Sequence, residues 1–238
     1  GVVDANGLPK ISTTNKTLGK FTPDWTGGIS NTFSYRSLSL SFLIDASVGG
    51  SIFSNTNKTG KYTGVLANTL SGRDAEHGGL WYYTDAMGNN VRLSESPSYS
   101  VSSDGLYYAQ VNGQSTRVYQ DGIMVEGVTE SGSKNEEVVS AEKYYHRIYS
   151  IAEANVYDAS YVKLREVALS YRLPRLWTQK LHLQEASVTL TGRNLWTIYK
   201  SVPNIDPESA LTTGNAQGVE AYSLPTTRSF GVNLSVKF

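Results

Sequence analysis

The sequence predicts an all-β fold built from long antiparallel strands, and three observations predict it. Strand-forming tyrosines and turn-forming glycines are abundant, with 16 Tyr and 22 Gly in 238 residues. Several stretches alternate between apolar and polar residues with a period of two, as half-buried strands do. No run of about 18 apolar residues occurs, so the sequence contains no candidate transmembrane helix.

Five long strands account for the regular part of the sequence. Each combines an apolar face with a face of Ser, Thr, Gly, Asn and charged residues, which suits a sheet that is wet on one side. The apolar–polar phase is irregular just before Arg165, as a β-bulge or the emergence of the strand from an apolar layer would make it. The expected strands lie near residues 24–35, 37–47, 159–173, 186–199 and 227–238.

The links between these strands alternate in length. Residues 35–37 and 173–185 make short links, whereas the long expected loops span 1–23, 48–156 and 200–226. Within 48–156, only "STRVYQDGIMVEGV" resembles a strand, and "NEEVVSAEKYYHRIYSIAEAN" favours one or two short helices. Short links at one end and long loops at the other are typical of a transmembrane β-barrel.

Aromatic side chains gather near the ends of the expected strands, as the interfacial girdles of such a barrel would. A soluble β-sandwich with the same rings in its core would produce a similar pattern, so composition and alternation leave both architectures open. The rings concerned are Tyr35, Tyr171, Trp177 and Phe238 near the short links, and Tyr161, Trp196 and Tyr199 near the long loops.

Charge and catalytic side chains exclude several function classes. The 21 basic and 21 acidic residues balance, which removes the usual electrostatic argument for nucleic-acid binding. Without cysteine there is no disulfide framework and no thiolate site. His77, His146 and His182 are far apart and have no metal-ligand spacing. We therefore predict no catalytic residue, no metal and no cofactor, and a protein that is not an enzyme.

The loop at 48–156 is the candidate binding region, because it carries aromatic rings among Asn, Ser and Asp residues. Flat rings beside hydrogen-bonding groups can stack on sugars or hold peptides. The simpler interpretation is that the rings pack the loop against its scaffold or against a partner protein. The candidate ligand- or partner-contacting residues are Trp81, Tyr82, Tyr83, Tyr99, Tyr107 and Tyr108.

Four blocks of sequence resemble the C-terminal barrel region of the SusC/RagA family, the TonB-dependent transporters of the Bacteroidetes outer membrane. They occur in the order found in that family and include every expected long strand. The blocks are "FTPDWTGGISNTFSYRSLSLSFLIDASVGGSIFS", "YVKLREVALSYRLP", "GRNLWTIY" followed by "IDPE", and "LPTTRSFGVNLSVKF".

The resemblance implies a multi-pass barrel of about 22 strands filled by an N-terminal plug. With about five strands and no plug, the chain would be a C-terminal part of such a transporter. The implied function is import of glycans or oligopeptides together with a SusD-like lipoprotein. Further implied partners are the remainder of the transporter, outer-membrane lipid, and the TonB system acting through the missing N-terminal part.

The last strand, "SFGVNLSVKF", also resembles the signal that the barrel-assembly machinery recognises. Its alternating apolar residues are expected to face lipid: Phe230, Val232, Leu234, Val236 and Phe238. Two other functions remain possible at this point, a soluble β-sandwich carbohydrate-binding module and a β-rich glycoside hydrolase. The hydrolase would need two facing carboxylates, and adjacent acids such as Glu136 and Glu137 are more typical of a solvated surface.

Overall fold

The computed structural model describes residues 1–180, 182–210 and 214–238. The chain divides into two compact units. Unit 1 comprises residues 1–17 and 56–155, and unit 2 comprises residues 18–55 and 156–238. None of the helices in the described ranges has the length and apolar character that a membrane crossing requires.

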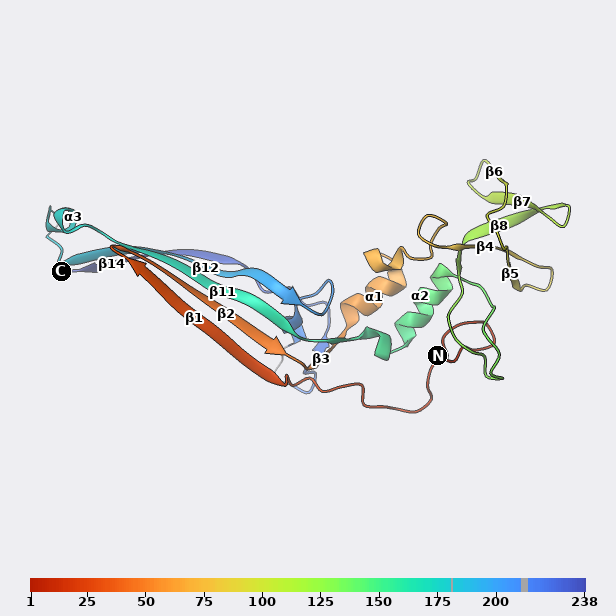
Figure 1. Cartoon of the computed structure of the whole chain (residues 1–238), viewed down its shortest axis with the longest axis horizontal. Coiled ribbons are helices and arrows are strands. Elements are labelled where there is room, and N and C mark those ends of the chain that lie inside the picture. The colour runs from red at the N-terminus through yellow and green to blue at the C-terminus, as the bar shows by residue number, and fades with distance from the viewer. Residues whose placement is uncertain (181, 211–213) are drawn as a thin grey trace. The chain divides into compact units, whose positions relative to one another are not determined.

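Unit 2 is built on a five-stranded antiparallel sheet of long strands, which run side by side in Figure 1. Its first two strands form a hairpin whose two-residue turn includes Arg36, with a φ of 53°. The five strands coincide with the five stretches of period-two alternation. In spatial order they are β1 (Trp25–Tyr35), β2 (Leu38–Val48), β11 (Tyr161–Arg172), β12 (Glu185–Lys200) and β14 (Ser229–Lys237).

The register of this sheet places residues of one character in continuous rows. One row crosses all five strands and is apolar throughout: Phe33, Leu40, Leu169, Leu190 and Val232. Because neighbouring positions on a strand point to opposite faces, the adjacent row lies on the other face. That row is polar throughout: Ser34, Ser39, Ser170, Thr189 and Asn233. The sheet therefore has one apolar face and one hydroxyl-rich face.

The apolar face is exposed in this chain. The side chains of its central row are between 38% and 75% exposed, with Leu169 the least and Val232 the most accessible. On the opposite face the hydroxyls pair across the strands, with Ser34 Oγ 2.7 Å from Ser39 Oγ and Ser170 Oγ 2.6 Å from Thr189 Oγ1. The polar face thus satisfies its own hydrogen bonds, whereas the apolar face has no cover within the described residues.

A β-bulge interrupts β11 at Arg165. The pairing of β11 with both neighbouring strands shifts between Leu164 and Glu166, so that Arg165 has no Cα partner on either side. The extra residue explains why the apolar–polar phase is irregular in the sequence, so of the two explanations that the pattern left open the structure shows the bulge.

Shorter elements complete unit 2. A three-stranded sheet in the order β10 (Val156–Asp158), β3 (Ser51–Ser54) and β13 (Val219–Glu220) adjoins a small core. That core consists of Ile52, Val202, Ile205 and Ala210. The helix α3 (Arg175–Lys180) occupies the link before β12, and the 3₁₀ helix η3 (Pro207–Ala210) lies in the loop that follows it. Residues 211–213 of the expected loop at 200–226 lie outside the described residues.

Unit 1 is organised around a six-stranded sheet in the order β5-β4-β8-β7-β6, with β9 pairing against β8. The helix α2 starts at a Ser140 cap, whose hydroxyl accepts a hydrogen bond from the Lys143 amide. The strands are β4 (Leu80–Thr84), β5 (Asn90–Arg92), β6 (Tyr99–Val101), β7 (Tyr107–Val111), β8 (Gln114–Ile123) and β9 (Val139–Ser140). The helices are α1 (Asn55–Thr63), α2 (Ala141–Ser150), η1 (Ala67–Thr69) and η2 (Glu153–Asn155).

The expectation that residues 48–156 contain little regular structure is therefore wrong. The sequence indicates the longest strand, β8, and the helix α2, but not the remaining strands of this sheet. Those strands have five residues or fewer, which is too short to establish a period-two pattern. Their Tyr, Asn and Ser residues resemble those of a loop.

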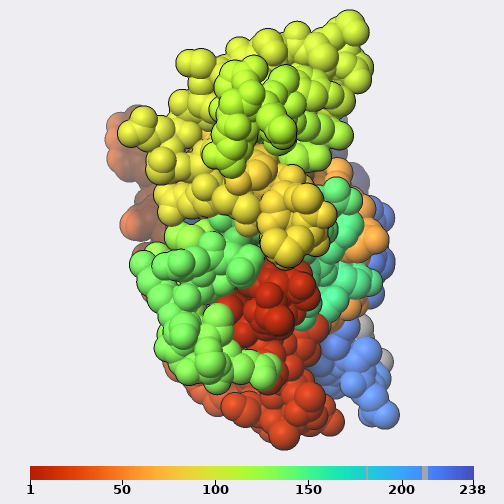
Figure 2. All heavy atoms as spheres, turned by 90° about the vertical axis from the view of Figure 1, so that its right-hand side faces the viewer, coloured from red at the N-terminus to blue at the C-terminus, as the bar shows by residue number. Residues whose placement is uncertain are grey.

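The N-terminal segment is anchored to unit 1 rather than free. The Val3 amide donates a hydrogen bond to the Val128 carbonyl at 2.9 Å, and the Val3 side chain is buried. Arg147 on α2 forms an ion pair with Asp4 at 2.7 Å. Figure 2 shows this segment, in red, packed beside the green stretch that precedes and includes α2.

Candidate functional site

Five ionisable side chains gather at one end of the polar face of the long sheet, and we call them the charged cluster. Asp45 comes from β2, Lys163 and Arg165 come from β11, and Asp206 and Glu208 come from the loop after β12. Lys163 and Asp206 are almost fully buried, with side chains 3% and 8% exposed. Such burial is rare for charged groups unless they are paired.

Each charge in the cluster has a partner of opposite sign. Lys163 Nζ lies 2.6 Å from Asp206 Oδ1 and 2.6 Å from Glu208 Oε2. Arg165 donates from Nε to Asp45 Oδ1 at 2.8 Å and from Nη1 to Glu208 Oε2 at 2.7 Å. Its Nη2 contacts the other Glu208 oxygen, so the guanidinium holds this carboxylate with two nitrogens.

The local backbone explains why these groups meet. Lys163 is the Cα partner of Asp45 in the pairing of β11 with β2. Without the bulge, strict alternation after Lys163 would place Arg165 and then Val167 on the polar face. With the extra residue, Arg165 stays on the polar face and Val167 points to the apolar face beside Phe42. The bulge thereby keeps both cations on the polar face, where they reach the same carboxylate, while Val167 points to the apolar face.

Asp206 accepts hydrogen bonds from residues near both ends of the loop between β12 and β14. Its Oδ2 accepts hydrogen bonds from the Thr226 amide at 3.1 Å and from the Thr226 hydroxyl at 2.5 Å. Its Oδ1 accepts from the Glu208 amide at 3.0 Å, at the start of η3. The two acids, which flank Pro207, therefore fix the short helix and the return of the chain towards β14.

The hydrogen bonds to these carboxylates favour their charged forms. Burial raises the pKa of Asp206, but hydrogen bonds from Lys163 and Thr226 outweigh burial and hold the pKa well below its usual range. For Glu208, burial likewise opposes the shift, and hydrogen bonds from Arg165 and Lys163 lower the pKa overall. Both acids are thus ionised at neutral pH.

This chemistry is that of a structural clamp. Within the described ranges, every buried side-chain nitrogen and oxygen has a hydrogen-bond partner. The two cations are fully engaged by the three carboxylates, so neither is available for proton transfer to a substrate. The described part of the chain also lacks any group of three or more His, Asp or Glu side chains placed to hold a metal ion.

The aromatic residues predicted for ligand or partner contact are, except for Tyr99, buried or partly buried in unit 1. Trp81 and Tyr82 are only 7% and 4% exposed. Trp81 packs against Tyr99 and Tyr107, with ring centroids 5.1 and 5.8 Å apart, while Tyr82 points to the other face of β4 and stacks on Tyr119.

The other predicted rings differ in their accessibility. Tyr83 and Tyr107 are partly buried against the core that Trp81 forms with Ala109 and Val118, and Tyr108 is also partly buried. Tyr99, on the edge strand β6, has 49% of its surface exposed. The sequence therefore identified rings that come together, but most of them stabilise the sheet that carries them. Contact with a ligand or partner stays a prediction, and Tyr99 presents the most accessible ring.

Most of the aromatic residues expected near the two ends of the long sheet are exposed there, and one expectation needs correction. Tyr161 does not join an aromatic girdle, because it lies on the polar face, where its hydroxyl donates to Glu208 Oε1 at 3.0 Å. Tyr199 and Trp196 are more than half exposed, and so is Tyr35 at the opposite end. On β14 and at the residue that follows it, the expected outward residues Phe230, Val232, Leu234, Val236 and Phe238 are all exposed.

Sequence reasoning did not predict the charged cluster, although it identified both segments that form it. "YVKLREVALSYRLP" contains Lys163 and Arg165, and "NIDPES" contains Asp206 and Glu208. The sequence did contain a hint of the cluster. Two cations, Lys163 and Arg165, lie where the apolar–polar alternation of the strand becomes irregular. Their partners are more than forty residues away and could not be inferred without the pairing of β11 with β12.

We predict that Lys163→Met destabilises the loop clamp by about 3 kcal/mol, because it leaves two buried carboxylates without a compensating charge. Hydrogen exchange at residues 202–210 should accelerate in the full-length protein. Arg193→Met is the matched control, since Arg193 pairs with Glu166 on the same sheet but is 65% exposed. That change should cost less than about 1 kcal/mol. Equal effects of the two substitutions would contradict the clamp.

The pH dependence of the clamp has a defined sign. Because the folded-state pKa values of Asp206 and Glu208 are lowered, their stabilisation is present above the unfolded pKa of about 4 and is lost as the pH falls below it. The difference in thermal midpoint between wild type and Lys163→Met should therefore be constant from pH 7 to about 5 and shrink below about 4. A difference that vanishes already near pH 6 would show that other groups control the loop.

Comparison with known proteins gives the following results. No family model matches the chain. The sequence is 25% identical over 242 residues to TonB-dependent receptor P3 of Formosa agariphila (strain DSM 15362), covering 99% of this chain and 18% of that receptor. In fold, the chain is similar to a chain of the RagAB peptide importer in its closed-closed state, with a TM-score of 0.50 and 18% identity. That similarity covers 96% of this chain and 19% of that one.

The same importer in its open-open state gives a TM-score of 0.45 over 92% of this chain and 17% of that one. The chain thus spans about a fifth of the length of the relatives it matches. The receptor match agrees with the resemblance that the four sequence blocks indicate. Along nearly its whole length, the chain is similar in sequence to a TonB-dependent receptor and in fold to a chain of the RagAB peptide importer.

Proposed function

We propose that this chain forms part of the wall and outer loops of a SusC-like transporter in the bacterial outer membrane. The transporter would import glycans or oligopeptides with a SusD-like surface lipoprotein and would draw energy from the TonB system. The match to a TonB-dependent receptor over 99% of the chain supports this function, and it supports a role in transport rather than catalysis.

The observation that carries the proposal is the exposed apolar face of the long sheet. Its central row places five apolar side chains in line across five strands, each at least 38% exposed. A contiguous apolar surface of this kind is unfavourable in water and marks contact with a partner or a membrane. A soluble β-sandwich would bury this face against a second sheet, so the exposure favours lipid.

Strand length and end residues agree with a bilayer crossing. The five strands have 9 to 16 residues, and a tilted transmembrane strand needs about 9–11. Exposed aromatic rings near both ends of the sheet would lie at the two interfaces, where outer-membrane barrels concentrate Trp and Tyr. These rings are Tyr35, Tyr171 and Trp177 on one side and Trp196 and Tyr199 on the other.

The opposite face of the sheet would line the interior of a barrel. It carries hydroxyl groups and the charged cluster, and interiors of such barrels are polar. β1 and β14 are the edge strands of the sheet. Unpaired backbone groups in lipid cost several kcal/mol each, so both edges would pair with strands from the remainder of the transporter. We also propose that the apolar residues of β14 serve recognition by the barrel-assembly machinery.

A direct test of transport uses cells that lack the receptor and cells that carry it on a plasmid. We expect uptake of labelled glycans or oligopeptides only in the second strain, and only with TonB and the lipoprotein present. RagAB is described as a peptide importer, so an oligopeptide pool and a glycan pool should be supplied separately. Uptake that persists without TonB would contradict the proposed mechanism.

We predict that Leu190→Lys reduces the amount of receptor in the outer membrane, because a lysine on the lipid face costs about 2–4 kcal/mol near the bilayer midplane. Thr189→Lys is the matched control, because it places the same charge one residue away on the polar face. Its receptor should reach the membrane at the wild-type level, as measured by immunoblotting of membrane fractions. The reverse order would assign the polar face to lipid and overturn the proposed orientation.

A further inference from the structure

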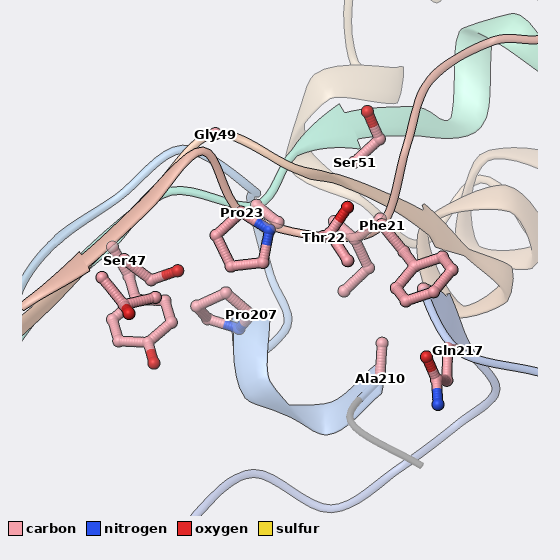
Figure 3. A pocket seen from close by; sticks show the side chains of 14 residues that line it. Phe21, Thr22, Pro23, Ser47, Gly49, Ser51, Pro207, Ala210 and Gln217 are labelled. Atoms are coloured by element: carbon pink, nitrogen blue, oxygen red, sulfur yellow. The ribbon is translucent and has the colours of Figure 1, made fainter. Parts of the chain in front are cut away.

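We propose that a hollow beside the charged cluster in unit 2 binds an uncharged, mainly apolar group about the size of an indole ring. The hollow has a volume of 380 Å³, within the range of about 300–1,000 Å³ that small-molecule pockets occupy. Figure 3 shows its walls, with Pro23 and Pro207 close together and Phe21, Ala210 and Gln217 at another side. Binding of such a group does not depend on the direction or energy source of transport.

The walls are apolar with a few neutral polar groups. Six of the lining residues are apolar: Phe21, Pro23, Ile52, Ala159, Pro207 and Ala210. Hydroxyls or amides come from Thr22, Thr26, Ser47, Ser51, Tyr161 and Gln217. Among the described lining residues none carries a charge. Because a charged ligand would lose its hydration without gaining a partner, this surface selects a neutral one.

The charged cluster lies next to the hollow but places no uncompensated charge in its wall. Pro207 and Tyr161 belong to both places: Pro207 separates the two clamped acids, and the Tyr161 hydroxyl bonds to Glu208. The neighbouring carboxylates are already engaged by Lys163, Arg165 and Thr226. Their charge is therefore compensated before any ligand arrives, and an apolar group would not face an unpaired ion.

The clamp also makes the wall rigid. Asp206 is bonded to Thr226 and to the first turn of η3, so the position of Pro207 is set from both sides. On another side, Gly218 has a φ of +78°, and a Cβ at this residue would lie 2.6 Å from Phe21 Cβ. Glycine thus permits the close approach that places Phe21 at the hollow. A site whose walls are already fixed loses less entropy on binding.

These features define the class of ligand. A flat or branched apolar body would fill the space between the two prolines and Phe21, and one or two hydrogen-bonding atoms would meet the hydroxyls. A sugar would have to bury many hydroxyls against a mainly apolar lining, which is unfavourable. Either a free small molecule or the apolar side chain of a larger ligand presents this chemistry.

The test measures indole binding to the full-length receptor in lipid nanodiscs by saturation-transfer NMR, with empty nanodiscs correcting for partition into lipid. Thr26→Phe should fill the hollow and weaken indole binding at least tenfold. Thr32→Phe is the matched control, because Thr32 is exposed on the same face of the same strand and does not line the hollow. Its affinity should equal that of wild type, and thermal midpoints should confirm that both variants fold.

A second variant distinguishes loss of the site from loss of the fold. Gln217 is exposed and lines the hollow, so Gln217→Glu adds a negative charge without disturbing the core. Wild type should prefer indole to the cationic analogue tryptamine, and Gln217→Glu should reverse this preference. N-acetyl-tryptophanamide in place of indole tests whether a side chain within a larger ligand is accepted.

Three results would overturn the proposal. They are wild-type indole binding no greater than that of empty nanodiscs, equal affinities for Thr26→Phe and Thr32→Phe, and tighter binding of glucose than of indole. Transport is not measured in these experiments. A failure here would leave the proposed transporter function standing, and a failure of the uptake assay would leave the binding result standing.

Discussion

The fold of unit 2 depends on the register that aligns side chains of one kind across five strands. A shift of one residue in any strand would move apolar side chains to the polar face and hydroxyls to the apolar face. Leu40, Leu169 and Leu190 therefore lie in one row, and Ser39, Ser170 and Thr189 lie in the next. The result is a sheet with two faces suited to two different surroundings, which is the basis of the proposed place in a membrane.

The register shifts in β11 between Val162 and Lys163 and between Leu164 and Glu166, and the charged cluster lies at these shifts. Beside the bulge at Arg165, two cations of β11 meet the carboxylates of a distant loop. Buried ion pairs contribute little net stability against apolar substitutes, but they strongly disfavour arrangements in which one partner is missing. The charged cluster thus specifies one position for the loop, and that position forms a wall of the adjacent hollow.

Features of the structure that depend on neighbouring residues could be predicted from the sequence. Features that depend on contacts between residues far apart in the sequence could not. Alternation is local, so the long strands could be predicted from the sequence, and residues such as Leu164, Arg165 and Val167 marked a break in the pattern with a bulge as one of two explanations. The short strands of unit 1 could not, because Asn90–Arg92 or Tyr99–Val101 is stabilised by its neighbours and not by its own pattern. The same reason applies to Trp81, whose burial depends on contacts with Tyr99 and Tyr107. The charged cluster was unpredictable because two of its three carboxylates, Asp206 and Glu208, lie in the loop after β12 and reach β11 only through the tertiary fold.

The central claim is that the row through Leu190 contacts lipid and the row through Thr189 does not. The most direct measurement places a nitroxide label at each position in turn, on the full-length receptor in a bilayer, and compares its collisions with oxygen and with a water-soluble nickel chelate. The account predicts that a label at residue 190 collides mainly with oxygen, which partitions into lipid, and that a label at residue 189 collides mainly with the chelate. Equal access of the chelate to both positions would contradict the account, because the apolar face would then be in water.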